Sequence, residues 1–383
     1  MAKTVYLDYA AATPMDPAVL AAMRPYFTDK FYNPSATYLA AKAVADDIEA
    51  ARVKVAGWLG ARPSEIIFTA GGTEANNLAL QGIMDSHPTG NVVISAIEHD
   101  SVINPAKAYN HKLVKVLASG QLDLEDLVKK IDSQTVLVSV MYANNEIGTI
   151  MPIRQISQLL RGIKKQRIAS GNKMPLYFHT DACQAASYVD LHVSRLGVDL
   201  MSVNGGKIYG PKQSGFLYIK TGSAVKPQIL GGGQENGLRS GTENVVAIVG
   251  LAEALDLVQA RRQGESKRLS QLQNLFISSL GKEIPSATVN GDLKNRLPSN
   301  VHITVDGQDN ERLMMMLDEK GIICAVGSAC AASSDKPSHV LRAIGLSDKQ
   351  AESSLRFSFG KLTTKADIKR SITELKRCLN SLA

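Results

Sequence analysis

The chain has 383 residues, of which 44% are hydrophobic and 21% charged, and its formal net charge is +7 at pH 7. No apolar run approaches the roughly 20 residues that span a bilayer, and the amino end has no long apolar region. We therefore expect two domains in a cytoplasmic protein that has neither a membrane span nor a secretory signal.

The modest positive charge gives little support for nucleic-acid binding. The clearest basic cluster has no interleaved aromatic residues and consists of Arg161, Lys164, Lys165 and Arg167. Such a cluster is typical of a solvated helix face, and a docking patch for an acidic protein is the alternative. We expect no nucleic-acid partner.

The cysteines show no metal-binding or disulfide pattern. No pair has Cys-x-x-Cys spacing among Cys183, Cys324, Cys330 and Cys378. A cytoplasmic chain keeps its thiols reduced, so neither a zinc site nor a disulfide framework is indicated. Each thiol has to be interpreted from its own surroundings.

The first part of the chain predicts an extended entry over residues 5–14 and then two helices. Asp16-Pro17 begins one helix with an acidic cap and a proline at the first helical position. Apolar residues recur at helical spacing from Tyr38 to about Trp58, and Gly60 ends that helix.

An alternation of strands and helices follows up to about residue 219. Strands are expected at 65–69, 91–96, 112–117, 135–141, 176–180, 199–203 and 215–219, and helices at 73–84, 122–131 and 153–165. Strands that are apolar throughout and alternate with helices indicate an α/β fold with a largely parallel sheet covered on both sides.

The last part of the chain predicts a smaller α/β domain. Helices are expected from Glu243 to about Arg262 and from Ser266 to Leu280, with strands at 300–305, 322–326 and 355–359. A final helix begins at a Thr364-x-x-Asp367 cap. We place the boundary inside the first of these helices, with residues 14–255 as the large domain and 1–13 plus 256–383 as the small one.

Lys207 follows an apolar strand and an Asn-Gly-Gly turn, and two interpretations are open. A lone Gly-Lys is most often a solvated turn lysine. The alternative is a lysine held in a pocket, whose amine forms a Schiff base with a carbonyl cofactor such as pyridoxal phosphate. The choice depends on whether other segments supply a phosphate site and an acid for a ring nitrogen.

Four further strand ends carry polar groups. Gly72 and Thr73 open a helix after two glycines, which favours a phosphate at the helix start, although strand–Gly-Gly–helix turns are common. His99, Asn145 and Asp181 follow three other strands, and each alone is compatible with a structural role. Gln184 lies on the side of Asp181 if the chain turns helical there. Together with Lys207, these groups indicate a ligand site at one edge of the sheet.

Two residues of the last part complete the set of candidates. Cys330 lies in a run of small residues, Gly327 to Asp335, which is either an incidental loop or a mobile tether for a reactive thiol. Arg356 stands on an otherwise apolar strand, and a buried arginine needs an anion, such as a substrate carboxylate. Cys324 and Cys378 are expected to be structural, and Cys183 is ambiguous.

Taken together, these segments resemble the cysteine desulfurases of the NifS/IscS type, among the fold-type I pyridoxal phosphate enzymes. The resemblance extends from end to end, and the Gly327-Ser-Ala-Cys330 loop is its most discriminating part. It implies a large domain with a mostly parallel seven-stranded sheet covered by helices, and a smaller α/β C-terminal domain. It also implies conversion of L-cysteine to L-alanine, with sulfur supplied for iron–sulfur cluster assembly or tRNA thiolation.

The resemblance assigns roles to matching positions. Lys207 would hold pyridoxal 5'-phosphate and move the substrate α-proton, His99 would stack on the ring, and Cys330 would accept the sulfur as a persulfide. Arg356 would bind the carboxylate of L-cysteine. The remaining cofactor and substrate contacts would come from Gly72, Thr73, Asn145, Asp181, Gln184, Asn204 and, from a second subunit of a homodimer, Thr242.

The sequence departs from the family pattern at several positions. Gly206 stands where histidine is usual and Asn204 where a serine usually contacts phosphate, so we expect the amides of Gly205 and Gly206 to rebuild that contact. Asn236 and Tyr38 replace an arginine and a histidine. A sulfur-acceptor protein is the expected partner. The alternatives are a selenocysteine lyase or other β-lyase, and a cofactor-binding platform with weak turnover.

Overall fold

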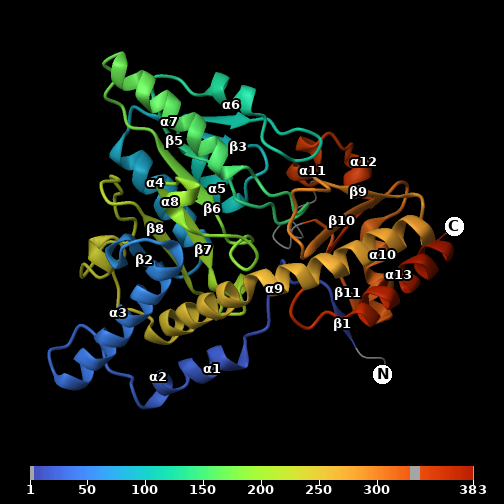
Figure 1. Cartoon of the computed structure of the whole chain (residues 1–383), viewed down its shortest axis with the longest axis horizontal. Coiled ribbons are helices and arrows are strands. Elements are labelled where there is room, and N and C mark those ends of the chain that lie inside the picture. Colours follow the sequence, from blue (N-terminus) through green and yellow to red (C-terminus); the bar gives the residue numbers. More distant parts are fainter. Residues whose placement is uncertain (1–3, 328–336, 383) are drawn as a thin grey trace.

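The computed structural model describes residues 4–327 and 337–382. Its centre is a seven-stranded sheet on the left of Figure 1, and a smaller lobe lies on the right. The strands of the large sheet, in spatial order, are β2 (Ile66–Thr69), β8 (Gly215–Ile219), β7 (Leu200–Asn204), β6 (Tyr177–Asp181), β5 (Thr135–Ser139), β3 (Asn91–Ser95) and β4 (His111–Val114). Only β8 runs antiparallel to its neighbours, so the predicted mostly parallel seven-stranded sheet is confirmed.

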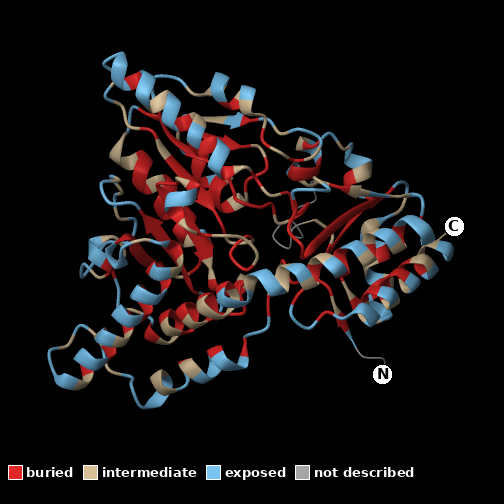
Figure 2. Ribbon diagram, viewed as in Figure 1, coloured by how far each residue is buried: buried red, intermediate tan, exposed pale blue. Residues whose placement is uncertain are grey.

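Alternate residues of the strands pack against helices on opposite faces of this sheet. On one face, Ile67 and Leu137 share a hydrophobic cluster with apolar residues of α4 (Gly72–Ser86) and α5 (Asp100–Ala106). On the other face, Phe68 and Val138 lie in a larger cluster with the remaining helices. Those helices are α1 (Pro17–Met23), α3 (Leu39–Leu59), α7 (Ile153–Ala169), α8 (Val193–Leu196) and the first part of α9 (Val245–Glu283). Figure 2 shows the resulting buried layer between exposed helix surfaces.

This part of the chain also contains shorter helices. They are α2 (Pro25–Thr28), α6 (Leu124–Lys130) and the 3-10 turns η1 (Pro63–Glu65), η2 (Gly205–Lys207) and η3 (Glu235–Gly237). In η3 both Glu235 and Asn236 have positive φ, of 49° and 57°. Asparagine adopts this region more readily than most other residues, so Asn236 is compatible with its backbone conformation.

The small lobe has a core of its own. The lobe contains a sheet of β12 (Ser354–Ser358), β10 (Asn300–Val305) and β9 (Ala287–Asn290), and the strand pair β1 (Val5–Tyr6) and β11 (Ile322–Ile323). Its helices are the end of α9, α10 (Asn310–Glu319), α11 (His339–Ala343), α12 (Asp348–Ala351) and α13 (Lys365–Asn380). Its hydrophobic cluster joins Val5 and Leu7 to residues from Leu269 onward. The proposed division at residue 255 stays a prediction, because α9 crosses that position and because Val340, Leu341 and Ala351 of α11 and α12 belong to the cluster of the large sheet.

The two helices expected at 243–262 and 266–280 are one continuous helix, α9, so this prediction is wrong. The gap between these two ranges contains Gly264, and glycine inside a helix costs about 1 kcal/mol relative to alanine. Burial on both sides of it offsets this cost, because Leu255 packs in the large core and Leu269 in the small one. Two strands are also shorter than expected, since β4 ends at Val114 and β11 at Ile323.

The predicted helix ends are confirmed. The Asp16 carboxylate accepts a hydrogen bond from the Ala18 amide, and Pro17 is the first residue of α1. Gly60 ends α3 in the left-handed conformation, and Thr364 with Asp367 forms a capping box on α13. Over the described residues, no helix is long and apolar enough to cross a membrane.

Two members of the basic cluster on α7 have partners within the chain. Arg167 is buried and donates to the carbonyl groups of Asp132 and Thr135. Lys164 pairs with Asp199 at 2.9 Å. The positive charge of this helix is therefore partly used to fix α7 against the sheet.

Candidate active site

One pocket lies at the carboxyl edge of the large sheet and collects groups from five strand ends. β2, β3, β5, β6 and β7 all end at this edge, because β2 and β7 are both antiparallel to β8. The pocket is lined by the predicted residues Gly72, Thr73, His99, Asn145, Asp181, Gln184, Asn204, Lys207 and Arg356. The structure thus brings these side chains together, and the role of each stays a prediction.

Asp181 is the last residue of β6 and is buried. Its Oδ1 accepts a hydrogen bond from the Cys183 amide at 2.9 Å, and its Oδ2 accepts one from Asn76 Nδ2 at 2.7 Å. These two donors fix the plane of the carboxyl group. A buried carboxylate held in this way suits a cationic partner, such as a protonated ring nitrogen.

His99 is oriented by the start of α5. Its Nδ1 accepts a hydrogen bond from the Ser101 amide at 3.1 Å and lies 2.8 Å from Ser101 Oγ. The neutral ring therefore carries its proton on Nε2. Asn76 Nδ2 also donates to Ser101 Oγ, at 2.8 Å, so a side-chain network connects His99 with Asp181.

The sequence analysis missed Asn76 and Ser101. A signal for Asn76 existed, because it follows Thr73 by three residues and so lies one helical turn further along α4. Its place between the histidine and the aspartate depends on the packing of α4 against β6, which local spacing does not reveal.

Lys207 extends from η2, directly after β7. Its Nζ donates to the carbonyl groups of Ala10 at 2.9 Å and Ala11 at 2.6 Å, and Gln184 Nε2 also donates to Ala10, at 3.0 Å. The amine is therefore held in the pocket by the amino-terminal segment. A solvated turn lysine, the common interpretation of Gly-Lys, does not fit this environment.

At the start of α4 the backbone lies close to neighbouring side chains. Gly71 has φ of +137°, and a Cβ atom at Gly72 would meet Cys183 Sγ at 2.5 Å. No other residue fits at position 72 without moving its neighbours. The glycine backbone and the amides at this helix start suit a phosphate group, a role that stays a prediction.

The expectation that the amides of Gly205 and Gly206 bind phosphate is wrong. The Gly205 amide donates to the Ser214 carbonyl at 2.9 Å, and the Gly206 amide donates to Asn204 Oδ1 at 2.8 Å. The second bond also determines which way the Asn204 amide group is turned. Asn204 Nδ2 lies 3.5 Å from the position of a Cβ atom at Gly72, which directs a side-chain donor to the start of α4.

Arg356 is 1% exposed and belongs to β12 of the small lobe. Its Nη2 pairs with Asp8 Oδ1 at 2.7 Å, and its Nη1 donates to the Asn145 carbonyl at 3.0 Å. The buried Nε has no hydrogen-bond partner within the described residues. A carboxylate ligand fits this unused donor. Asp8, the acid that faces the arginine, is another residue that the sequence analysis did not assign.

Two other ionisable groups beside the pocket favour their neutral forms. Burial raises the pKa of Glu98 well above its usual range, and Asp181 raises it further. Burial and the same aspartate raise the pKa of the Cys183 thiol. A protonated thiol is a poor nucleophile, which favours a structural role for Cys183.

The other predicted residues lie elsewhere. Cys330 falls in residues 328–336, outside the described parts of the chain. Thr242 is exposed and is not among the residues that line this pocket, so its assignment to a second subunit's site stays a prediction. Cys324 and Cys378 are buried, as expected of structural thiols.

Comparisons with known proteins agree with this arrangement. The aminotransferase class-V family matches residues 5–370. A cysteine desulfurase IscS of Dictyoglomus turgidum is 39% identical over 100% of this chain and 96% of its own length. The X-ray structure of a NifS-like protein from Rickettsia africae is 30% identical, with a TM-score of 0.88 over 98% of this chain and 99% of that one.

A further solved structure is described as SspA in complex with cysteine. It is 34% identical, with a TM-score of 0.80 over 93% of this chain and 99% of that one. Class-V aminotransferases imply pyridoxal phosphate as cofactor. The chain belongs to this family and, within it, to the cysteine desulfurases of the IscS/NifS type.

Proposed function

We propose that this enzyme converts L-cysteine to L-alanine and leaves the sulfur as a persulfide on Cys330. The observation that carries the proposal is the pocket, in which Lys207, Asp181 and Arg356 line one cavity at the carboxyl edge of the sheet. An amine, a buried acid and a buried arginine are the groups needed for an aldehyde cofactor and an amino-acid substrate. The relative described as a complex with cysteine supports the choice of substrate.

The residues present fit pyridoxal phosphate. Asp181 would pair with the ring nitrogen, Lys207 with the aldehyde, and His99 would cover the ring. The phosphate would lie in the cradle at Gly72, with the Thr73 hydroxyl and the Asn204 amide as donors. Gln184 and Asn145 would contact the ring oxygen and the substrate. When bound, this cofactor supplies an electron sink for bond breaking at carbon.

The protein groups have distinct tasks around that sink. The Asp181 carboxylate keeps a proton on the ring nitrogen, because a buried negative charge favours a positive partner. Lys207 Nζ takes the substrate α-proton and returns it later. Arg356 binds the substrate carboxylate, which fixes the substrate sulfur on the side of the small lobe.

Sulfur transfer then balances without another reactant. The Cys330 thiolate forms a sulfur–sulfur bond with the substrate sulfur as the carbon–sulfur bond breaks. The bonding electron pair stays with carbon, and protonation of that carbon gives the methyl group of alanine. The enzyme retains a persulfide, which a sulfur-acceptor protein removes for iron–sulfur cluster assembly or tRNA thiolation.

The surface supports the proposal of a homodimer. Large apolar side chains are exposed in the region of the first three helices, among them Phe27 at 60%, Phe31 at 68% and Leu39 at 83%. Clusters of exposed apolar side chains mark interaction surfaces. A second subunit on this surface would account for them, and in such a dimer Thr242 would serve the neighbouring site.

Persulfide trapping tests the proposed function. The purified enzyme, loaded with cofactor and given L-cysteine, should release alanine and gain one sulfur atom on the peptide that contains Cys330. Cys330→Ser should abolish both, and Cys183→Ala should retain both. Absence of alanine from the parent enzyme, or sulfur on the Cys183 peptide, would refute the assignment.

A further inference from the structure

The turn after β5 is unusually well fixed for a loop. Asn144 Oδ1 accepts hydrogen bonds from the amides of Glu146 at 2.9 Å and Ile147 at 3.0 Å, and Asn144 Nδ2 donates to the Ile97 carbonyl at 3.0 Å. The buried Asn144 side chain thus ties the turn both to itself and to the end of β3. Whatever this turn binds is held in a fixed position relative to the sheet.

Glu146 lies in this turn and is 2% exposed. Its Oε2 accepts a hydrogen bond from Ser338 Oγ at 2.6 Å, a short bond of the kind that a carboxylate makes. Ser338 also caps α11, because its Oγ accepts a hydrogen bond from the Leu341 amide at 3.3 Å. Glu146 therefore helps to fix the start of α11, together with the hydrogen bond between His339 Nε2 and the Glu98 carbonyl at 3.0 Å.

The carboxyl group of Glu146 also lies beside Gly327, the described residue that precedes residues 328–336. A Cβ atom at Gly327 would be 4.0 Å from Glu146 Oε2. Gly327 and Ser338 lie on either side of residues 328–336, which include Cys330. The two ends of this segment, which we call its stems, thus come together at one buried acid.

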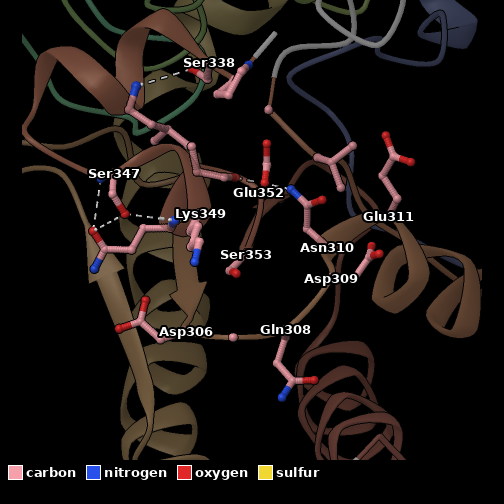
Figure 3. Close-up of a pocket in the computed structure, with 17 residues that line it drawn as sticks. Asp306, Gln308, Asp309, Asn310, Glu311, Ser338, Ser347, Lys349, Glu352 and Ser353 are labelled. Carbon is pink, nitrogen blue, oxygen red and sulfur yellow. Dashed lines mark hydrogen bonds between the residues drawn. The ribbon is translucent and has the colours of Figure 1, made fainter. Parts of the chain in front are cut away.

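The stems are also tied to the predicted substrate clamp. The backbones of Ala325 and Arg356 exchange hydrogen bonds of 3.1 and 2.7 Å, and the Arg356 side chain donates to the Asn145 carbonyl, one residue before Glu146. One turn of the large domain therefore contacts both the arginine and the stems. On the outer side, Ser338 borders an open pocket with the acidic residues Asp309, Glu311 and Glu352 (Figure 3), so its buried contact is on the Glu146 side.

We propose that Glu146 is a positioning residue for sulfur transfer, which holds the stems of the Cys330 segment in register with Arg356. The inference rests on the proposed function, since it concerns the step in which Cys330 meets the substrate. Glu146 itself touches neither cofactor nor substrate. Its loss should slow the transfer of sulfur and leave the binding of L-cysteine unchanged.

Kinetics of three variants test this proposal. We expect Glu146→Ala and Ser338→Ala each to lower kcat about tenfold with little change in KM, because each removes the Ser338–Glu146 hydrogen bond, which lies outside the substrate site. Glu146→Gln keeps an oxygen that accepts the Ser338 hydroxyl, and it should stay close to the parent. The matched control is Glu311→Gln, an acid of the outer pocket that contacts neither stem.

The double variant Glu146→Ala/Ser338→Ala separates positioning from general damage. If the two residues act through one contact, the double variant should be no slower than either single variant. Multiplied losses, an unchanged kcat in Ser338→Ala, or a loss confined to cofactor content would overturn the proposal.

Hydrogen exchange gives a readout that does not require turnover. In the cofactor-loaded enzyme without substrate, Glu146→Ala should accelerate exchange in the peptide that covers α11, and Glu311→Gln should not. If the parent enzyme makes no alanine, this measurement still tests whether Glu146 holds the start of α11. Failure of the proposed function and failure of this positioning role are therefore distinguishable. Unchanged exchange in Glu146→Ala would refute the positioning role of Glu146.

Discussion

The cofactor side and the sulfur side of the pocket are held in different ways. On the cofactor side, Asp181 and Lys207 come from the ends of β6 and β7, and their positions follow from the register of neighbouring strands. On the sulfur side, the described stems are held by short elements, the two-residue β11 and the five-residue α11, and by local contacts such as the hydrogen bond from Ser338 to Glu146 and that between His339 Nε2 and the Glu98 carbonyl.

This difference matches the two tasks. Proton transfer and charge stabilisation require groups fixed within a fraction of an ångström, which a sheet provides. Under the proposed function, Cys330 has to reach the substrate and later an acceptor protein, so its support has to be local.

Removing the amine should abolish function on the cofactor side. Lys207→Ala should lose the yellow absorbance of bound cofactor and lower alanine formation by about 10³-fold or more, as expected when a principal acid–base group is removed. Lys212→Ala, an exposed lysine in the same run, is the control and should behave like the parent enzyme. Retention of the chromophore in Lys207→Ala would disprove the assignment.

Neutralising the buried acid should have the next largest effect. Asp181→Asn keeps an oxygen for the Cys183 amide and removes the charge, so we expect alanine formation to fall about 10²-fold, the effect of a removed charge-stabilising group. The absorbance maximum of the bound cofactor should also shift, because the ring nitrogen loses its proton. A variant with parent-like activity and spectrum would exclude this role.

Acid should destabilise both regions through buried histidines. Burial lowers the pKa of His179 on β6 to about 4 and that of His302 on β10 to about 3. Because the unfolded state binds these protons first, each histidine should reduce the free energy of unfolding as pH falls below about 6.5, by about 2 kcal/mol at pH 5.

Urea unfolding between pH 7.5 and pH 5 measures this loss. The sign follows from the lowered pKa values, since stability is full above the unfolded pKa and declines towards the folded one. His302→Gln removes one of these two histidines, so its free energy of unfolding should depend less steeply on pH than that of the parent. An equal slope in His302→Gln and parent would contradict the prediction.

The rebuilt phosphate contact should have the smallest effect. Asn204→Ala should weaken cofactor binding about tenfold, the value of one hydrogen bond to a charged group. Asn204→Asp keeps the acceptor for the Gly206 amide and places a negative charge near the phosphate, so it should bind cofactor still more weakly. Titration of the apoenzyme, with inorganic phosphate as competitor, measures both, and parent-like binding by Asn204→Asp would exclude the contact.

Much of the site was visible in the sequence because parallel strands place their carboxyl ends at one edge. Asp181, His99 and Lys207 each follow an apolar strand, and that position alone predicted their convergence. The partners of these residues were not predictable in the same way. Asp8 pairs with Arg356, which is 348 residues away in the sequence, and the Ala10 carbonyl accepts a hydrogen bond from Lys207, which is 197 residues away. Only the folded chain reveals these contacts.

Errors in the predicted elements have a similar origin. The break expected between residues 262 and 266 ignored the two cores that hold α9 on either side of it. The two-glycine phosphate contact ignored that Ser214 and Asn204 already accept the hydrogen bonds of those amides. In both cases tertiary packing outweighed a local preference.

The pairing of β1 with β11 has a consequence for biosynthesis. Val5 and Tyr6 leave the ribosome first, yet their strand partners, Ile322 and Ile323, are made more than three hundred residues later. The carbonyl groups that accept hydrogen bonds from Lys207 belong to Ala10 and Ala11, shortly after β1. The strands of the large sheet are therefore made before the partner strand that completes this side of the pocket. Cofactor capture should therefore be a late, post-translational event, and a ribosome-bound chain truncated before β11 should remain colourless.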